Sequence, residues 1–313
     1  MKKLLVKKED ANERIDKFLR KEIFLNQNKT RGDIIRHIKS GNILVDDKII
    51  KPGYLLKEGQ KIKINIKKEK AGIIPNKKIS LSIVYQDKNI IIVDKPPGIS
   101  VHPSNPSEKN TLVNFLTYKF PEIKTVHDNS RDAYLRPGVV HRLDKDTSGV
   151  IIIARNQKAF EELKKLFQEH KIEKKYLALV YGKLENKKGK IEKPIARAST
   201  YRKQVVAGKK TQTKIREAVT EYSVIKKYAN CSLIEVIPKT GRMHQIRVHL
   251  FSIGHPIIGD SLYILKKYKK TKTARQLLHA QELNFKLFDK TFSFQAPLPL
   301  DFRLFLDEIR KKG

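Results

Sequence analysis

The stretch His141-Arg142-Leu143-Asp144-Lys145-Asp146-Thr147-Ser148-Gly149 carries an unusual set of charged and polar side chains for its place in the chain. It follows the expected end of a strand at 138–140, and it precedes the apolar run 150–154, which is typical of a buried strand. Buried strands are more often joined by simple turns of Gly, Pro, Asn or Asp. Since most polar loops perform no chemistry, the rest of the sequence must decide whether this one does.

The overall composition indicates a folded protein with an anionic partner. The 313 residues are enough for one large domain and a small one, and 39% are hydrophobic, so a proper core can form and global disorder is excluded. The 67 Lys and Arg residues exceed the 33 Asp and Glu residues, which gives a net charge of +34. Nucleic acid phosphate is the commonest partner for such a field. An anionic membrane is the rival interpretation, and a Lys-rich proteome would supply part of the charge without functional meaning.

Cysteine content and hydropathy indicate the compartment. Cys231 is the single cysteine, so no intrachain disulfide can form, as is typical of a reducing cytoplasm. The N-terminal apolar run is too short for a signal peptide, and no run approaches the ~18 apolar residues of a membrane span. We expect a basic cytoplasmic protein that does not enter the membrane.

The hydrophobic pattern divides the chain into three parts. Residues 1–70 have two amphipathic helical segments followed by short strands. Residues 71–80 continue a stretch that mixes charge, Gly and Pro without a period, and we interpret them as a linker. Residues 81–313 alternate short β-branched strands with a few helices, which predicts an α+β domain with a mixed, mainly antiparallel sheet.

The second helix of the first part has a basic face. It starts at Thr30, and its apolar positions leave Arg31, Arg36 and Lys39 on other faces. Two short helices with a small sheet and a basic helix face resemble the S4 RNA-binding domain. The resemblance implies RNA contacts at Thr30, Arg31, Arg36 and Lys39, while a plain small α/β domain is the alternative.

Four stretches of the larger part occur in an order that points to one family. They are 141–149, Asp94-Lys95-Pro96-Pro97-Gly98 with Val101-His102-Pro103, Lys175-Tyr176-Leu177-Ala178, and Arg242-Met243-His244-Gln245-Ile246-Arg247-Val248-His249. This set resembles the RluA-type pseudouridine synthases, with an S4 domain in front as in the members that act on large-subunit ribosomal RNA. Ile264 and Leu287-Phe288 depart from the family pattern, at positions away from the chemistry.

The resemblance implies an isomerase that detaches uracil from its ribose, rotates it and rejoins it through carbon. No redox change or energy input is needed, so no cofactor is expected. By resemblance Asp144 is the nucleophile or charge stabiliser, Arg247 is its ion-pair partner and Tyr176 packs on the target base. The alternatives are a phosphate contact for Arg247 and a core strand position for Tyr176.

A base in folded RNA must be extruded before it can react. The resemblance places Arg142 where the base was, because a planar guanidinium can stack there, and it places His141 at the same rim. The alternative for Arg142 is a phosphate contact. We also expect Lys95 and His102 to point outward from their loop toward RNA, and His244 to contact it.

Metal binding is not expected. His244 and His249 are five residues apart, a spacing that suits shared ligation neither on a strand nor on a helix. Residues 197–216 are strongly basic and are expected to form a mobile insertion that faces RNA. We therefore expect a monomeric RNA-binding enzyme, with ribosomal RNA as the favoured substrate and transfer RNA as the alternative. A non-catalytic RNA-binding or ribosome-assembly factor is the competing hypothesis.

Overall fold

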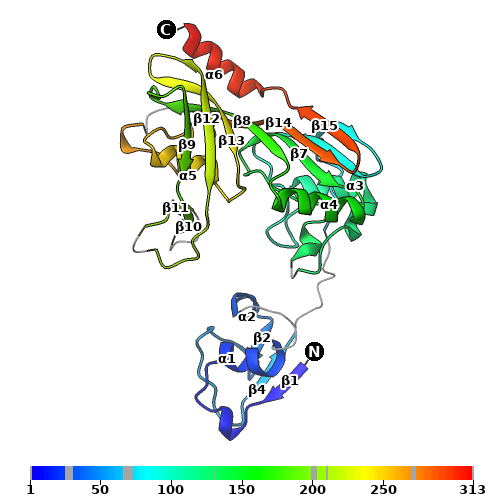
Figure 1. Cartoon of the computed structure of the whole chain (residues 1–313). Helices are drawn as coiled ribbons and strands as arrows, with labels where there is room; N and C mark the ends of the chain where they lie inside the picture. The colour runs from blue at the N-terminus through cyan, green and yellow to red at the C-terminus, as the bar shows by residue number, and fades with distance from the viewer. Residues whose placement is uncertain are drawn as a thin grey trace. The chain divides into compact units, whose positions relative to one another are not determined.

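The structure is a computed structural model that describes residues 2–24, 31–65, 73–130, 132–198, 203–208, 211–268 and 273–311. Over these ranges the chain divides into two compact units, Met1–Ala71 and Gly72–Gly313 (Figure 1). The described residues of the expected linker, 73–80, are folded onto the second unit. The backbone amide of Asn76 donates to the carbonyl of Asn114 at 2.9 Å, and Ile79 packs against the core. None of the helices in the described ranges has the length and apolar character that crossing a membrane requires.

The first unit is a small sheet packed against helices. Apolar residues spaced along α1 meet those of α2, since Ile15, Phe18 and Leu19 share a buried cluster with Ile34 and Ile38. The first helix ends at Leu19, where a π-helical turn follows α1. The elements are β1 (Lys2–Leu5), a 3-10 turn (Lys8–Asp10), α1 (Ile15–Leu19), the π turn (Arg20–Phe24), α2 (Arg31–Lys39), β2 (Ile43–Val45), β3 (Lys48–Ile49) and β4 (Lys61–Ile64).

Of the four residues in the first unit that are expected to contact RNA, three lie exposed on α2. These are Arg31, Arg36 and Lys39. The Nε atom of Arg31 donates to Asp16 at 2.8 Å, so this side chain is also tied to the unit's interior. Thr30 lies outside the described residues.

The second unit is built on one large sheet. Its elements are β5 (Ser82–Gln86), β6 (Ile90–Lys95), α3 (Leu112–Lys119), β7 (Ser148–Ala154), α4 (Gln157–Gln168), β8 (Glu173–Tyr181), β9 (Lys188–Glu192), β10 (Ile195–Arg197), β11 (Gln204–Val206), β12 (Val219–Lys227), β13 (Cys231–Pro238), α5 (Gln245–Ser252), β14 (Leu278–Leu287), β15 (Lys290–Gln295) and α6 (Leu300–Lys311), with 3-10 turns at Pro121–Thr125, Ala133–Leu135 and Lys266–Tyr268. Among the described residues nine strands pair in the order β5-β6-β7-β14-β8-β13-β12-β9, with β15 beside β14. The pairing of β7 with β14 is parallel and the other strand pairs of this sheet are antiparallel over the described residues, so the expectation of a mixed, mainly antiparallel sheet is confirmed.

Both faces of the sheet are covered, which explains the uninterrupted apolar runs of its central strands. On β7, Val150 and Ile152 belong to the cluster that contains Phe160 and Leu163 of α4. The alternate residue Ile151 belongs to the opposite cluster, which contains residues of α3 and α5. Figure 1 shows α4 lying across the strands β7 and β14.

The parallel junction between β7 and β14 is short and tight. Ala280 pairs with Gly149 of β7 and also with Tyr176 of β8, so β14 sets these two strands in register. Gly149 has φ +116°, and a Cβ there would lie 2.1 Å from the carbonyl oxygen of Ala280. Ser148 and Gly149, the last two residues of the polar stretch 141–149, thus begin the strand, and the expected strand at 138–140 is a single bridge from Val139 to Ile153.

Candidate active site

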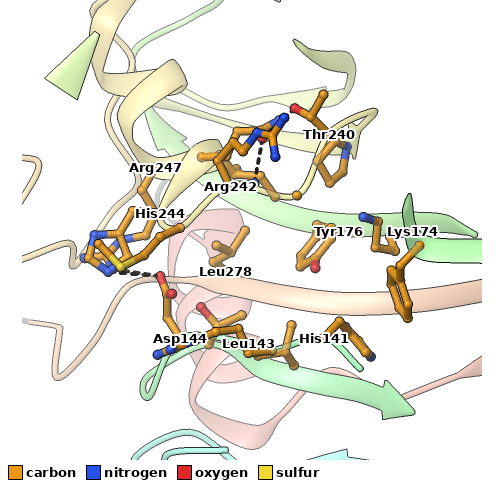
Figure 2. A pocket seen from close by; sticks show the side chains of 18 of the residues that line it. His141, Leu143, Asp144, Lys174, Tyr176, Thr240, Arg242, His244, Arg247 and Leu278 are labelled. Carbon is orange, nitrogen blue, oxygen red and sulfur yellow. Dashed lines mark hydrogen bonds and ion pairs between the residues drawn. The ribbon is translucent and has the colours of Figure 1, made fainter. Parts of the chain in front are cut away.

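The loop 141–147 forms one wall of a cavity of about 600 Å³, a volume that suits a small ligand. Figure 2 shows Asp144 and His141 along this wall, with Thr240 and Arg242 on the opposite wall and Tyr176 and Leu278 between them. Residues far apart in sequence therefore meet here. All three of the expected catalytic residues line the cavity, namely Asp144, Tyr176 and Arg247.

An ion-pair chain with two carboxylates and one guanidinium is the main charged feature of the cavity. Arg247 donates from Nη1 to Asp144 at 2.8 Å, and from Nε and Nη2 to Asp260 at 2.7 and 2.9 Å. The side chain of Arg247 is 5% exposed and that of Asp260 is fully buried, whereas the side chain of Asp144 keeps 19% exposure at the cavity. Burial lowers the pKa of Arg247, but the bonds and charges of Asp260 and Asp144 outweigh it and raise the pKa. Arg247 is therefore a permanent cation beside Asp144.

Tyr176 lies on β8 with its side chain toward the cavity. Burial, and then the negative charge of Asp144, raise the pKa of Tyr176 well above its usual value. The phenol consequently keeps its proton at neutral pH. Leu278 of β14 also lines the cavity, so an apolar surface lies beside the ion pair.

His244 links the helix α5 to the ion-pair chain. It precedes α5 in the left-handed conformation, with φ 55°. Its Nδ1 atom hydrogen-bonds to the hydroxyl of Tyr263 at 3.1 Å, and its Nε2 atom lies 3.8 Å from Asp144. Burial lowers the pKa of His244 below its usual value, so the ring is neutral at pH 7. The ring is too far from Asp144 to replace Arg247 as its partner.

The expectation that Lys95 points outward is wrong. Its side chain is fully buried, and Nζ donates to the carbonyl oxygens of Pro96, Ile99 and Lys145 at 2.9 Å each. Burial lowers the pKa of Lys95 to about 7, although Asp146 and Asp144 oppose this shift. The loop after β6 surrounds the ammonium group, which also connects this loop to Lys145, the residue after Asp144. Lys95 therefore holds the loop wall in place and is not available to RNA.

The remaining residues expected near the active-site cavity lie at different depths. Arg142 is exposed, and its Nη1 atom lies 3.4 Å from Nε2 of His102. His141 stacks on Phe167 at 4.6 Å between ring centroids, and its Nε2 atom accepts the backbone N–H of Ile152 at 3.0 Å. Burial lowers the pKa of His141 to about 3. His141 lines the cavity as a neutral ring that also anchors the first residue of the loop to β7.

Sequence reasoning missed Asp260, Tyr263 and Lys174. Asp260 orients Arg247, Tyr263 holds His244, and Lys174 lines the cavity. Asp260 and Tyr263 lie in the segment Gly259-Asp260-Ser261-Leu262-Tyr263, directly before Ile264, where the chain departs from the family pattern. In the described part of the chain, no three His, Cys, Asp or Glu side chains gather in a group that could hold a metal ion.

Several known proteins are similar to this chain. A model of the family described as RNA pseudouridylate synthase matches residues 89–252. An uncharacterized RNA pseudouridine synthase of Aquifex aeolicus is 38% identical over 275 residues, which cover 87% of this chain and 82% of that protein. Ribosomal large subunit pseudouridine synthase D of Pseudomonas aeruginosa is 32% identical over 298 residues, which cover 90% of this chain and 88% of that protein. The solved structure of human RNA pseudouridylate synthase domain containing 1 has a TM-score of 0.58 and 25% identity, covering 76% of this chain and 98% of that one.

Fold, site and relatives together define an RNA-modifying isomerase. The chain belongs to the RNA pseudouridine synthase family. The resemblance to the RluA-type members is confirmed, as is the expected α+β fold of their catalytic domain with a small domain in front. The chain is an enzyme, so the hypothesis of a non-catalytic RNA-binding factor is set aside.

Proposed function

We propose that this enzyme isomerises specific uridines of large-subunit ribosomal RNA to pseudouridine, with Asp144 as the nucleophile. The observation that carries the proposal is the Asp144 carboxylate, open to a cavity and held 2.8 Å from Arg247. Support for the ribosomal substrate comes from relatives named ribosomal large subunit pseudouridine synthase, such as enzyme C of Buchnera aphidicola and enzyme D of Pseudomonas aeruginosa. Transfer RNA is the alternative substrate.

The reaction exchanges one bond of uracil for another. The bond between N1 of uracil and C1′ of ribose breaks, the base rotates, and a bond between C5 and C1′ forms. C5 loses its proton and N1 ends with one, so substrate and product are isomers and no oxidant or cofactor is consumed. A carboxylate is a competent covalent nucleophile, and the Arg247 guanidinium holds the carboxylate of Asp144 in place through a hydrogen bond of 2.8 Å.

Tyr176 and Leu278 would hold the detached base. An aromatic ring and an aliphatic side chain both line the cavity, and they offer apolar surface to a planar base. Because its raised pKa keeps Tyr176 protonated, the phenol can donate a hydrogen bond or shuttle a proton but does not start as a base. This arrangement leaves Asp144 as the anion that meets the sugar.

Arg142 would replace the extruded base. Extrusion costs roughly a few kcal/mol, and a planar guanidinium that stacks in the vacated place recovers part of this cost. Arg142 is exposed beside the cavity and lies against His102, so its position agrees with this role. His141 shapes the same wall from inside.

The first unit and the net charge support RNA binding beyond the active site. Arg31, Arg36 and Lys39 on α2 give this S4-like unit a basic surface, which would contact RNA near the target. The +34 charge acts in the same sense. We infer that the enzyme works as a monomer in the cytoplasm, and its single cysteine, Cys231, agrees with a reducing compartment.

The test is the substitution Asp144→Asn, with Asp146→Asn as the matched control two residues away. The Asp144 variant should fold and bind RNA but form no detectable pseudouridine, because the amide is not a nucleophile. The control, whose residue does not line the cavity, should stay active. Pseudouridine formation that survives Asp144→Asn would contradict the assigned role.

Mapping pseudouridines in cells with and without the gene tests the substrate. Loss of a position in large-subunit ribosomal RNA supports the proposal. Loss confined to transfer RNA would overturn the ribosomal assignment and leave the chemistry unaffected.

A further inference from the structure

We propose that a second, basic cavity beside the active site binds the sugar-phosphate backbone of the RNA strand next to the target uridine. This proposal rests on the proposed function, since it concerns the position of the RNA strand when the target uridine occupies the active-site cavity. The cavity measures about 570 Å³ and lies in the second unit.

The two cavities share a wall. Gly241, Arg242 and Met243, in the segment that leads into α5, line both of them. An RNA strand whose uridine occupies the first cavity must leave it across one of its walls, and this wall opens onto a second hollow. Continuity with the reaction site is the first reason to assign RNA, and not a protein, to the basic cavity.

The charge of the basic cavity is the second reason. Four cations line it, and no carboxylate does; the cations are Arg197, Lys214, Arg216 and Arg242. In the part of the chain that the structure describes, no ion pair involves Lys214, Arg216 or Arg242. The Nε atom of Arg242 donates to the backbone carbonyl of Glu217 at 3.1 Å, which positions the guanidinium without neutralising it. Guanidinium groups match phosphate oxygens in pairs, and uncompensated cations favour a polyanion.

The basic cavity is a built part of the fold. Ile195 of β10 and Arg216 exchange two backbone hydrogen bonds of 2.9 Å, and the hydroxyl of Thr213 donates to the carbonyl of Arg197 at 2.6 Å. These bonds fix the backbone that carries two of the cations. The cations therefore face the cavity from paired backbone, a preorganised arrangement that reduces the entropy lost on binding.

Tyr263 connects the basic cavity to the active site. Its hydroxyl accepts the backbone N–H of Gln204, the first residue of β11, at 2.7 Å, and it hydrogen-bonds to His244 at 3.1 Å. Its ring belongs to a buried cluster with Ile195 and with Val248 of α5. One side chain thus braces both sites, so a strand held in the basic cavity has a fixed position relative to Asp144.

The test is the double substitution Lys214→Gln with Arg216→Gln in the full chain, assayed on unmodified large-subunit ribosomal RNA made by transcription. Both side chains are exposed, so the variant should fold. An exposed ion pair changes an equilibrium constant by up to about fivefold. We expect KM to rise by roughly five- to twentyfold with kcat retained. The slope of log K against log salt should become shallower by about 1.4, at about 0.7 for each lost phosphate contact with a single strand.

The matched control is Lys119→Gln with Lys124→Gln, which removes the same charge from exposed residues that line neither cavity. The proposal is overturned if both double variants change KM and the salt slope equally, because general charge then explains the effect. It is also overturned if the Lys214 and Arg216 variant lowers kcat while KM stays unchanged. If the wild-type chain forms no pseudouridine in this RNA, the proposed substrate fails. The salt slope still tests the basic cavity, because phosphate contacts do not depend on base sequence.

Discussion

Replacing Asp260 with asparagine tests whether the active site depends on the whole ion-pair chain. Asp260 does not line the cavity, yet it accepts hydrogen bonds from Nε and Nη2 of Arg247, while Asp144 accepts one from Nη1. Asparagine has nearly the same shape but lacks the charge and presents one NH2 group in place of an oxygen. The substitution therefore changes the partner of Arg247 while Asp144 and Tyr176 stay intact.

The size of the effect follows from the contacts. Oδ1 of Asp260 accepts from Nη2 of Arg247 at 2.9 Å and from the backbone amides of Leu262 and Tyr263, and an asparagine oxygen can keep these bonds. The NH2 group would face the Nε–H of Arg247, where Oδ2 now lies at 2.7 Å, and two donors cannot bond. Breaking a buried ion pair costs about 3–5 kcal/mol. Because part of the contact survives, we expect a loss of about 3 kcal/mol in the free energy of unfolding.

Activity should fall along with stability. A guanidinium that loses its buried anchor shifts toward Asp144 and moves the carboxylate. A displacement of about 1 Å at a reacting group can cost about a hundredfold in rate. We expect kcat on RNA to fall by that order at a temperature where the variant is fully folded.

The assay combines urea unfolding, followed by circular dichroism, with initial rates of pseudouridine formation. The control is Glu122→Gln, which removes a carboxylate from a half-exposed pair with Arg155, 2.7 Å long and away from the active-site cavity. This control should cost less than about 1 kcal/mol and leave kcat unchanged. Equal stability losses in the two variants, with wild-type kcat in both, would refute the idea that Asp260 positions Arg247.

Three further predictions concern the supports of the site. Lys95→Met leaves three part-buried carbonyl groups without the buried ammonium that donates to them, so thermal unfolding should show a loss of about 3 kcal/mol; a loss under 1 kcal/mol would contradict the role of Lys95. Gly149→Ala places a Cβ against the carbonyl of Ala280 at positive φ and should cost about 2–4 kcal/mol in urea unfolding, whereas Gly98→Ala, at positive φ in open space, should cost only about 1–2. His141 titrates near pH 6.5 when unfolded but near 3 when folded, so its stabilising contribution is present above pH 6.5 and is lost as pH falls toward 3. At pH 5 the loss is about 2 kcal/mol, and urea unfolding of His141→Gln should lack this part of the pH dependence.

Local patterns were sufficient to find the central strands and the loop between them. The run 150–154 is buried in β7, and the amphipathic spacing after residue 157 gives α4. These elements depend on neighbours in sequence, whose periodicity is visible. The apolar run does not include Ser148 and Gly149, which also belong to β7. Their place in the strand depends on the pairing of Gly149 with Ala280, which joins segments 131 residues apart and leaves no local signal.

In the candidate site, too, some residues have a local sequence signal and others depend on contacts between distant segments. The cavity contains Asp144, Tyr176 and Arg247, which the motifs had indicated, but their second layer of contacts was hidden. Charge suggested that Lys95 is exposed, and only the fold brings three carbonyl groups around it. Asp260 looked like an ordinary turn residue, because its function arises from the direction in which Arg247 approaches it. Partners of this kind are fixed by tertiary geometry, which composition and spacing do not encode.

The pairing of Ala280 with both Gly149 and Tyr176 also sets when the enzyme can become active during its own synthesis. Domains generally fold from the N-terminus as they are translated. Here β14, which aligns the two early segments, follows Asp144, Tyr176 and Arg247 in the chain. A growing chain that already contains these three residues still lacks the strand that sets β7 and β8 in register. The active-site cavity can therefore take its final shape only after β14 has been synthesised.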